Sequence, residues 1–152
     1  MLPLARPRKV PDAVVRVMLA DDNLEHATTT AMLLRTAGYD VCALPSGTLL
    51  LEQFPAFDPD VVILDLAMPQ LSGYDVARAL RADKRGAEVL LIALTCYNNQ
   101  TDRLMTKEAG FDHHLAKPVD TYTLTALIRD YLAGNRPVRV PVITENNVGV
   151  AA

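Results

Sequence analysis

Two short apolar runs are the strongest indication of fold in this sequence. Val61–Leu64 is wholly apolar, and Glu88–Leu94 is apolar after its first residue. A strand with one face in water alternates apolar and polar residues, whereas a strand that is buried on both faces reads as a continuous apolar run. The two runs therefore predict central strands of a parallel sheet that helices cover on both sides.

Segments with a helical pattern separate the strands. The other expected strands are 14–20, 40–44 and 112–116, and the expected helices are 24–37, 46 to about 54, 73–82, 100–109 and a last helix after residue 120. Ser46 and Asp120 are suited to cap helices. Pro55 and Pro59 are expected to end the second helix near Phe54. Strict alternation with short connections predicts a doubly wound α/β domain with a five-stranded parallel sheet.

The two ends of the chain differ in composition from the middle. Residues 1–12 combine prolines with basic residues, and residues 134–152 combine prolines, asparagines and small residues. We expect a flexible N-terminal arm and a flexible C-terminal tail around one domain at residues 13–133.

The overall composition narrows the class of protein. The 15 basic and 18 acidic residues give a formal charge of −3, which lacks the basic footprint of a nucleic-acid-binding protein. Two cysteines do not suggest a disulfide framework. No apolar run approaches the roughly 18 residues of a membrane span, and the N-terminus lacks a secretory signal. We expect a soluble, cytoplasmic protein with neither a membrane nor a nucleic-acid partner.

Polar residues worth attention follow the predicted strands. They are Asp21 and Asp22 after the first strand, Asp65 after the third, Thr95 after the fourth and Lys117 after the fifth. In open parallel sheets, ligands bind outside the carboxyl ends of the strands. The sequence therefore predicts one crevice that contains three carboxylates, a hydroxyl and an ammonium group.

The chemistry of this residue set favours phosphoryl transfer. Three neighbouring carboxylates repel one another, and a hard cation such as Mg²⁺, or Mn²⁺ as an alternative, relieves that repulsion. Phosphoryl transfer depends mainly on positioning and charge neutralisation, and a carboxylate can act as the nucleophile. Lys117 can supply positive charge to phosphoryl oxygens, and the Thr95 hydroxyl can donate a hydrogen bond.

These residues and their context resemble the receiver domains of two-component signalling. The matching motifs are Leu19-Ala20-Asp21-Asp22-Asn23, Leu64-Asp65-Leu66-Ala67-Met68-Pro69 with Gly73, Ala93-Leu94-Thr95 and Lys117-Pro118. The stretch from Ala109 to Asp120 looks especially like receivers attached to hybrid histidine kinases. The resemblance implies a flavodoxin-like receiver fold with strand order 2-1-3-4-5 and a cis Lys117-Pro118 peptide.

The resemblance also implies a role for each residue of the site. Asp65 would be the phosphoacceptor. Asp22 and Asp65 would bind Mg²⁺ directly, Asp21 mainly through water, and the backbone carbonyl of Ala67 would be the third protein ligand. Lys117 would pair with Asp65 and then with the phosphoryl group, and Thr95 would move toward that group as a switch.

The partners that the resemblance implies are proteins. A histidine kinase or a histidine phosphotransfer protein would supply the phosphoryl group. The output face would consist of the fourth helix, the fifth strand and the fifth helix, which would bind a downstream protein. The protein would not be a dedicated enzyme, although it would catalyse its own phosphorylation and a slow dephosphorylation.

Several positions depart from the family pattern. His114 occupies the switch position that is normally Tyr or Phe, and it is either a switch residue or a plain surface histidine on an edge strand. Cys96 is expected to be a small packing residue. Ala67 cannot orient a water molecule and Tyr97 could shield the phosphoryl group, which suggests a long-lived phosphorylated state. His26 is interpreted as an ordinary helix residue.

Two other functions stay open at this point. One is a phosphorylation-independent adaptor with a receiver fold, against which the complete set of acids argues. The other is a phosphatase with an Asp nucleophile, but such enzymes place a second acid two residues later, where this chain has Ala67. The sequence also leaves open whether the chain is a stand-alone receiver or a piece of a hybrid kinase.

Overall fold

The computed structural model describes residues 14–96 and 100–134. They form a single five-stranded parallel sheet in the order β2-β1-β3-β4-β5, which confirms the predicted fold. The strands are β1 (Arg16–Ala20), β2 (Asp40–Leu44), β3 (Val61–Asp65), β4 (Leu90–Thr95) and β5 (His113–Ala116). The helices are α1 (Leu24–Thr36), α2 (Gly47–Phe57), α3 (Gly73–Ala82), α4 (Gln100–Ala109) and α5 (Thr121–Leu132). The predicted arm at residues 1–12, nearly all of the predicted tail and Tyr97 lie outside the described residues.

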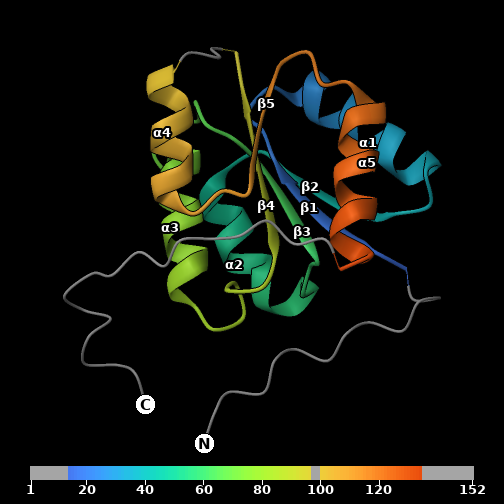
Figure 1. Ribbon diagram of the computed structural model, residues 1–152, viewed down its shortest axis with the longest axis horizontal. Helices are drawn as coiled ribbons and strands as arrows, with labels where there is room; N and C mark the ends of the chain where they lie inside the picture. Colours follow the sequence, from blue (N-terminus) through green and yellow to red (C-terminus); the bar gives the residue numbers. More distant parts are fainter. Residues whose placement is uncertain (1–13, 97–99, 135–152) are drawn as a thin grey trace, which may run out of the picture.

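Helices cover both faces of the sheet (Figure 1). Helices α1 and α5 pack on one face, where α1 contributes Leu34 and α5 contributes Ile128 to one hydrophobic core. Helices α2, α3 and α4 pack on the other face around a second core that contains Leu50 and Leu80. This two-sided covering accounts for the continuous apolar runs in the sequence.

The strands supply alternate side chains to the two cores. Val61 and Ile63 of β3 face the core of α1 and α5, whereas Val62 and Leu64 face the core of α2, α3 and α4. Every residue of β3 and β4 is buried. Asp65, the last residue of β3, is thereby held in a fixed position at the carboxyl edge of the sheet.

Helix α2 does not end near Phe54, the position predicted from Pro55 and Pro59. It continues through Pro55 to Phe57 and stops at Asp58, whose backbone is left-handed with φ of 52°. A proline inside a helix removes one backbone hydrogen bond and crowds the preceding turn. The extra turn places Phe57 against the hydrophobic core and under the guanidinium of Arg16, at 4.2 Å from the ring centre. The expected end near Phe54 was therefore wrong because tertiary packing outweighs the local cost of Pro55.

A partly buried arginine links α3 to the amino edge of the sheet. The Arg81 side chain of α3 donates hydrogen bonds to the carbonyls of Gly110, Gly86 and Val89 at 2.9, 2.9 and 2.8 Å. It also forms an ion pair at 2.9 Å with Asp112, whose side chain is fully buried and whose Oδ2 atom accepts the Leu91 N–H. This group, which we call the Arg81 clamp, joins α3 to the starts of β4 and β5.

Helix length and apolarity also bear on membrane association. Across residues 14–96 and 100–134, no helix has both the length and the apolar character that a bilayer span requires.

Candidate functional site

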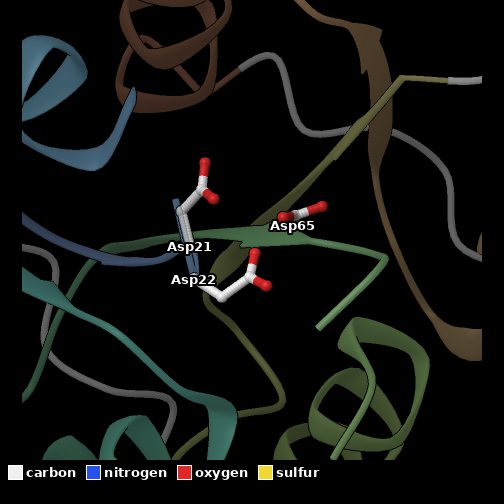
Figure 2. Close-up of side chains that lie close together, drawn as sticks. All are labelled: Asp21, Asp22 and Asp65. Atoms are coloured by element: carbon white, nitrogen blue, oxygen red, sulfur yellow. The ribbon is translucent and has the colours of Figure 1, made fainter. Parts of the chain in front are cut away.

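Three carboxylates meet at the carboxyl edge of the sheet. Asp21 and Asp22 follow β1, Asp65 ends β3, and one oxygen of each lies within 4.8 Å of the others. Figure 2 shows the three side chains grouped at the ends of these neighbouring strands. Asp21 is fully buried, Asp65 is 4% exposed and Asp22 is exposed. The parallel register of β1 and β3 brings together residues that are far apart in sequence.

Asp21 is enclosed by hydrogen-bond donors. Its Oδ1 atom accepts the Asn23 N–H at 2.9 Å, and its Oδ2 atom contacts Lys117 Nζ at 3.0 Å and His26 Nδ1 at 2.5 Å. Burial raises the pKa of Asp21, but the hydrogen bonds from Asn23, Lys117 and His26 outweigh it and hold the pKa below its usual value. Asp21 is therefore a stable buried anion.

Asp65 is less well stabilised as an anion. Its Oδ1 atom accepts the Ala67 N–H at 3.1 Å, and its Oδ2 atom lies 3.3 Å from Lys117 Nζ. Burial raises the pKa of Asp65, and the negative charge of Asp21 adds to the increase, although Ala67 and Lys117 oppose it. The ionised form of Asp65 thus gains from any additional positive charge at this edge.

Lys117 lies between the two buried acids. Its side chain is only 13% exposed and contacts both Asp21 and Asp65. Burial lowers the pKa of Lys117, but the two carboxylates reverse this effect and raise it. The Lys117–Pro118 peptide is cis, as the family resemblance implies.

The site carries an excess of negative charge. Three carboxylates face a single ammonium group, so the four side chains sum to a charge of about −2 when all are ionised. Oxygen donors with net negative charge fit a hard divalent cation such as Mg²⁺. Asp22 is the most exposed of the three acids and is free of the buried hydrogen bonds that occupy Asp21.

Thr95 and Ala67 flank the acids. Thr95 ends β4, is 5% exposed, and its carbonyl accepts the Lys117 N–H at 2.8 Å. Ala67 is exposed, and its N–H holds the Asp65 carboxylate in place. The structure thus brings together all five residues that the sequence singled out at the strand ends, with Ala67 beside them.

The two histidines of β5 point to opposite faces of the sheet. His113 pairs in register with Ile92 of one core, and His114 pairs with Ala93 of the other. His114 is half-buried, and its Nδ1 atom lies 3.2 Å from the hydroxyl of Thr106 on α4. His114 therefore lies on the edge strand β5 with one ring nitrogen against α4, and its role as a switch residue stays a prediction.

Cys96 and His26 differ from what the sequence suggested. Cys96 is exposed and is not a packing residue. His26 is not an ordinary helix residue, because its ring reaches back from the first turn of α1 to Asp21. The signal that could have revealed it is its place in the first turn of a helix that closely follows a strand and the acid after that strand.

Gly73 lets α3 approach the phosphoacceptor candidate closely. A Cβ atom at this position would lie 2.5 Å from the carbonyl oxygen of Asp65 and 3.0 Å from the Cα atom of Leu66. Both are backbone atoms, so α3 or the end of β3 would have to move.

We expect Gly73→Ala to lower the free energy of unfolding by about 1–3 kcal/mol, the usual cost of overpacking. It should also weaken binding of Mg²⁺, because Asp65 moves with its backbone. Urea unfolding and calorimetric titration would measure the two effects. Arg78→Ala, at an exposed position on the same helix, is the control, and a Gly73→Ala protein that matches it would contradict this explanation.

Comparisons with known proteins agree with this geometry. A family model described as "Response regulator receiver domain" matches residues 17–129. The receiver domain of the sensor histidine kinase PA1611 from Pseudomonas aeruginosa, solved with a magnesium ion coordinated in its active-site cleft, is 30% identical with a TM-score of 0.73. That similarity covers 80% of this chain and 99% of the other. The chemotaxis protein CheY4 of Vibrio cholerae is 25% identical with a TM-score of 0.74, over 77% of this chain and 98% of the other.

Curated relatives are longer than this chain. The DNA-binding response regulator MtrA of Mycobacterium leprae is 32% identical over 139 residues, which are 90% of this chain and 60% of that protein. The chain thus spans about three-fifths of the length of the first curated relatives that it matches.

Proposed function

Because this chain belongs to the response regulator receiver family, we propose that it is a phosphorelay switch that accepts a phosphoryl group on Asp65. The observation that carries the proposal is the position of Lys117, which contacts Asp65 and the buried anion Asp21 at the same time. From this position the ammonium group of Lys117 can contact a phosphoryl group on Asp65 while its ion pair with Asp21 keeps the lysine at the site. The exposed Asp22 completes a donor set that suits a metal ion.

The proposed cation is Mg²⁺, and Mn²⁺ would fit the same oxygen donors. Asp22 and Asp65 would hold it directly, with the Ala67 carbonyl as the third protein ligand. Asp21 would act mainly through water, because three of the roughly four acceptor positions of a carboxylate are already used. When bound, the cation neutralises the negative charge that phosphoryl transfer concentrates at the carboxyl edge of the sheet.

The proposed reaction is a displacement at phosphorus. An oxygen of the Asp65 carboxylate forms the new bond, and the bond from phosphorus to the nitrogen of a donor phosphohistidine breaks. The released imidazole takes up a proton. Lys117 offsets the negative charge of the phosphoryl oxygens, and the Thr95 hydroxyl donates to one of them after the residue moves inward.

The proposed partners are a histidine kinase or a histidine phosphotransfer protein upstream and a protein bound by the α4–β5–α5 face downstream. Large hydrophobic side chains support that face: Leu104 and Met105 of α4 are 60% and 40% exposed, and Tyr122 of α5 is 78% exposed. His114 connects β5 of this face to α4 through Thr106. We propose His114 as the switch residue that acts with Thr95, and residues 13–133 as the receiver unit.

A phosphatase function is less well supported. The position two residues after Asp65 is Ala67, which offers neither an acid nor a base. The protein would catalyse its own phosphorylation and slow dephosphorylation and would not be a dedicated enzyme. The hypothesis of a long-lived phosphorylated state depends on Ala67 and Tyr97 and predicts slow loss of the phosphoryl group from the wild-type protein.

Acetyl phosphate tests the proposed function directly. With Mg²⁺, we expect the purified protein to gain one phosphoryl group, which intact-mass spectrometry detects. With EDTA, uptake should fall to the background, because nothing offsets the charge of three carboxylates against an incoming anion. Mg²⁺ alone should raise the melting temperature, since it binds only the folded site. Uptake that is unaffected by EDTA would contradict the proposed role of the metal.

A further inference from the structure

We infer that His26 is a positioning residue for this site: its imidazole holds the buried Asp21 carboxylate in the orientation that keeps Lys117 at Asp65. The inference rests on the proposed function. It assigns a specific task to His26, whose imidazole contacts Asp21 and affects Lys117 and Asp65 only through that carboxylate.

Three hydrogen bonds form a closed ring between β1 and α1. The Asn23 N–H donates to Asp21 Oδ1 at 2.9 Å, the His26 N–H donates to Asn23 Oδ1 at 3.1 Å, and His26 Nδ1 lies 2.5 Å from Asp21 Oδ2. The first bond fixes the turn after β1, and the second caps α1. Only the third bond involves the imidazole, so a change of that side chain leaves both backbone bonds in place.

The geometry defines which ring nitrogen carries the proton. Asp21 is held as a carboxylate, because its hydrogen bonds lower its pKa despite full burial. A carboxylate only accepts hydrogen bonds, so His26 Nδ1 must be the donor. The side chain is 21% exposed, which keeps the remainder of the ring accessible at the rim of the site.

Lys117 and His26 share one oxygen atom. Asp21 Oδ2 contacts Lys117 Nζ at 3.0 Å and His26 Nδ1 at 2.5 Å. The Asn23 N–H holds Oδ1, and the imidazole of His26 holds Oδ2, so His26 helps to set the orientation of the oxygen that Lys117 contacts. Without the imidazole, Asn23 still holds Oδ1, but Oδ2 keeps Lys117 as its only donor among the described residues, and the position of Lys117 at 3.3 Å from Asp65 becomes less well defined.

Asp22 lies inside the same ring. The chain passes from Asp21 through Asp22 to Asn23, and the hydrogen bonds of the ring hold the residues on both sides of Asp22. The exposed carboxylate proposed as a direct metal ligand therefore neighbours, along the chain, the residue whose carboxylate His26 holds. Groups that orient the ligands of a metal typically change its affinity by about 10–100-fold when they are removed.

Two substitutions separate positioning from general structure. His26→Leu keeps a side chain of similar bulk but removes the donor. His26→Asn places its Nδ2 atom where histidine has Nδ1, so it keeps the donor and removes the rest of the ring. For the wild-type protein and both variants, the measurements are Mn²⁺ affinity by electron paramagnetic resonance, the rate of phosphorylation by acetyl phosphate at saturating Mg²⁺, and the melting temperature.

We expect His26→Leu to weaken Mn²⁺ binding and slow phosphorylation by about tenfold each. His26→Asn should restore both to near wild-type values, and a nitrogen-15 spectrum of the wild-type protein should show His26 protonated on Nδ1. If the wild-type protein and the His26→Leu variant are phosphorylated equally well, the inference is wrong and the proposed function still stands. Loss in both variants would show that the Nδ1 donor is not the cause, which also overturns it. A wild-type protein that takes up no phosphoryl group would remove the proposed function, and the inference with it.

Discussion

Replacement of Asp65 by asparagine should abolish phosphoryl uptake from acetyl phosphate and Mg²⁺ while leaving the protein folded. The amide has no nucleophilic oxygen anion, so the bond to phosphorus cannot form. The free energy of unfolding should change much less than the phosphoryl uptake. Burial and the charge of Asp21 disfavour the ionised form of Asp65, as its raised pKa indicates. The amide removes this repulsion while losing the attraction of Lys117.

Intact-mass spectrometry and thermal unfolding, measured on the same samples, would test both parts of this prediction. Asp40→Asn is a matched control, because Asp40 begins β2 at the opposite edge of the sheet and its side chain is 50% exposed. This control should take up the phosphoryl group as the wild-type protein does. An Asp65→Asn protein that is labelled to the same extent would place the phosphoacceptor elsewhere.

The second large effect concerns stability. Arg81→Met should lower the free energy of unfolding by about 3–5 kcal/mol, the usual cost of removing one partner of a buried ion pair. The Arg81 side chain is 14% exposed and that of its partner Asp112 is fully buried, so water cannot replace the lost cation easily. The carbonyls of Gly110 and Val89 also lose a charged donor. A loss of this size is a large part of the stability of a small domain.

Urea unfolding would measure the loss, with Arg78→Met as the control. Arg78 lies on the same helix and pairs with Asp75 at 3.3 Å, but both side chains are more than half exposed. Exposed pairs contribute about 0–1 kcal/mol, so this control should lie close to the wild-type protein. Equal effects of the two substitutions would show that the Arg81 clamp is not a major contributor to stability.

Much of the fold followed from local patterns in the sequence. The apolar runs at Val61–Leu64 and Glu88–Leu94 identified the central strands, because a strand covered on both sides has no polar face. Alternation of strands and helices then predicted the parallel sheet. Asp21, Asp22, Asp65, Thr95 and Lys117 were found by their place at strand ends, since parallel strands gather their carboxyl ends at one edge.

Contacts between distant residues were not visible in the sequence. The imidazole of His26 turns back to contact Asp21, and the Arg81 clamp joins residues that lie up to 31 positions apart. The helix through Pro55 depends on the contacts of Phe57 with Arg16 and the core. In each case the contact forms only in the folded chain, and for Pro55 it outweighs a local preference.

The Arg81 clamp also bears on how a signal could travel. It grips the carbonyl of Gly110, directly after α4, whereas the other end of α4 begins five positions after Thr95. The inward movement proposed for Thr95 would therefore act on a helix that Arg81 holds at its far end. Helix α4 would then pivot about its C-terminal end, so its displacement would be greatest near Gln100 and smallest near Gly110. A partner protein that binds the first turns of α4 would therefore be the most sensitive to this displacement.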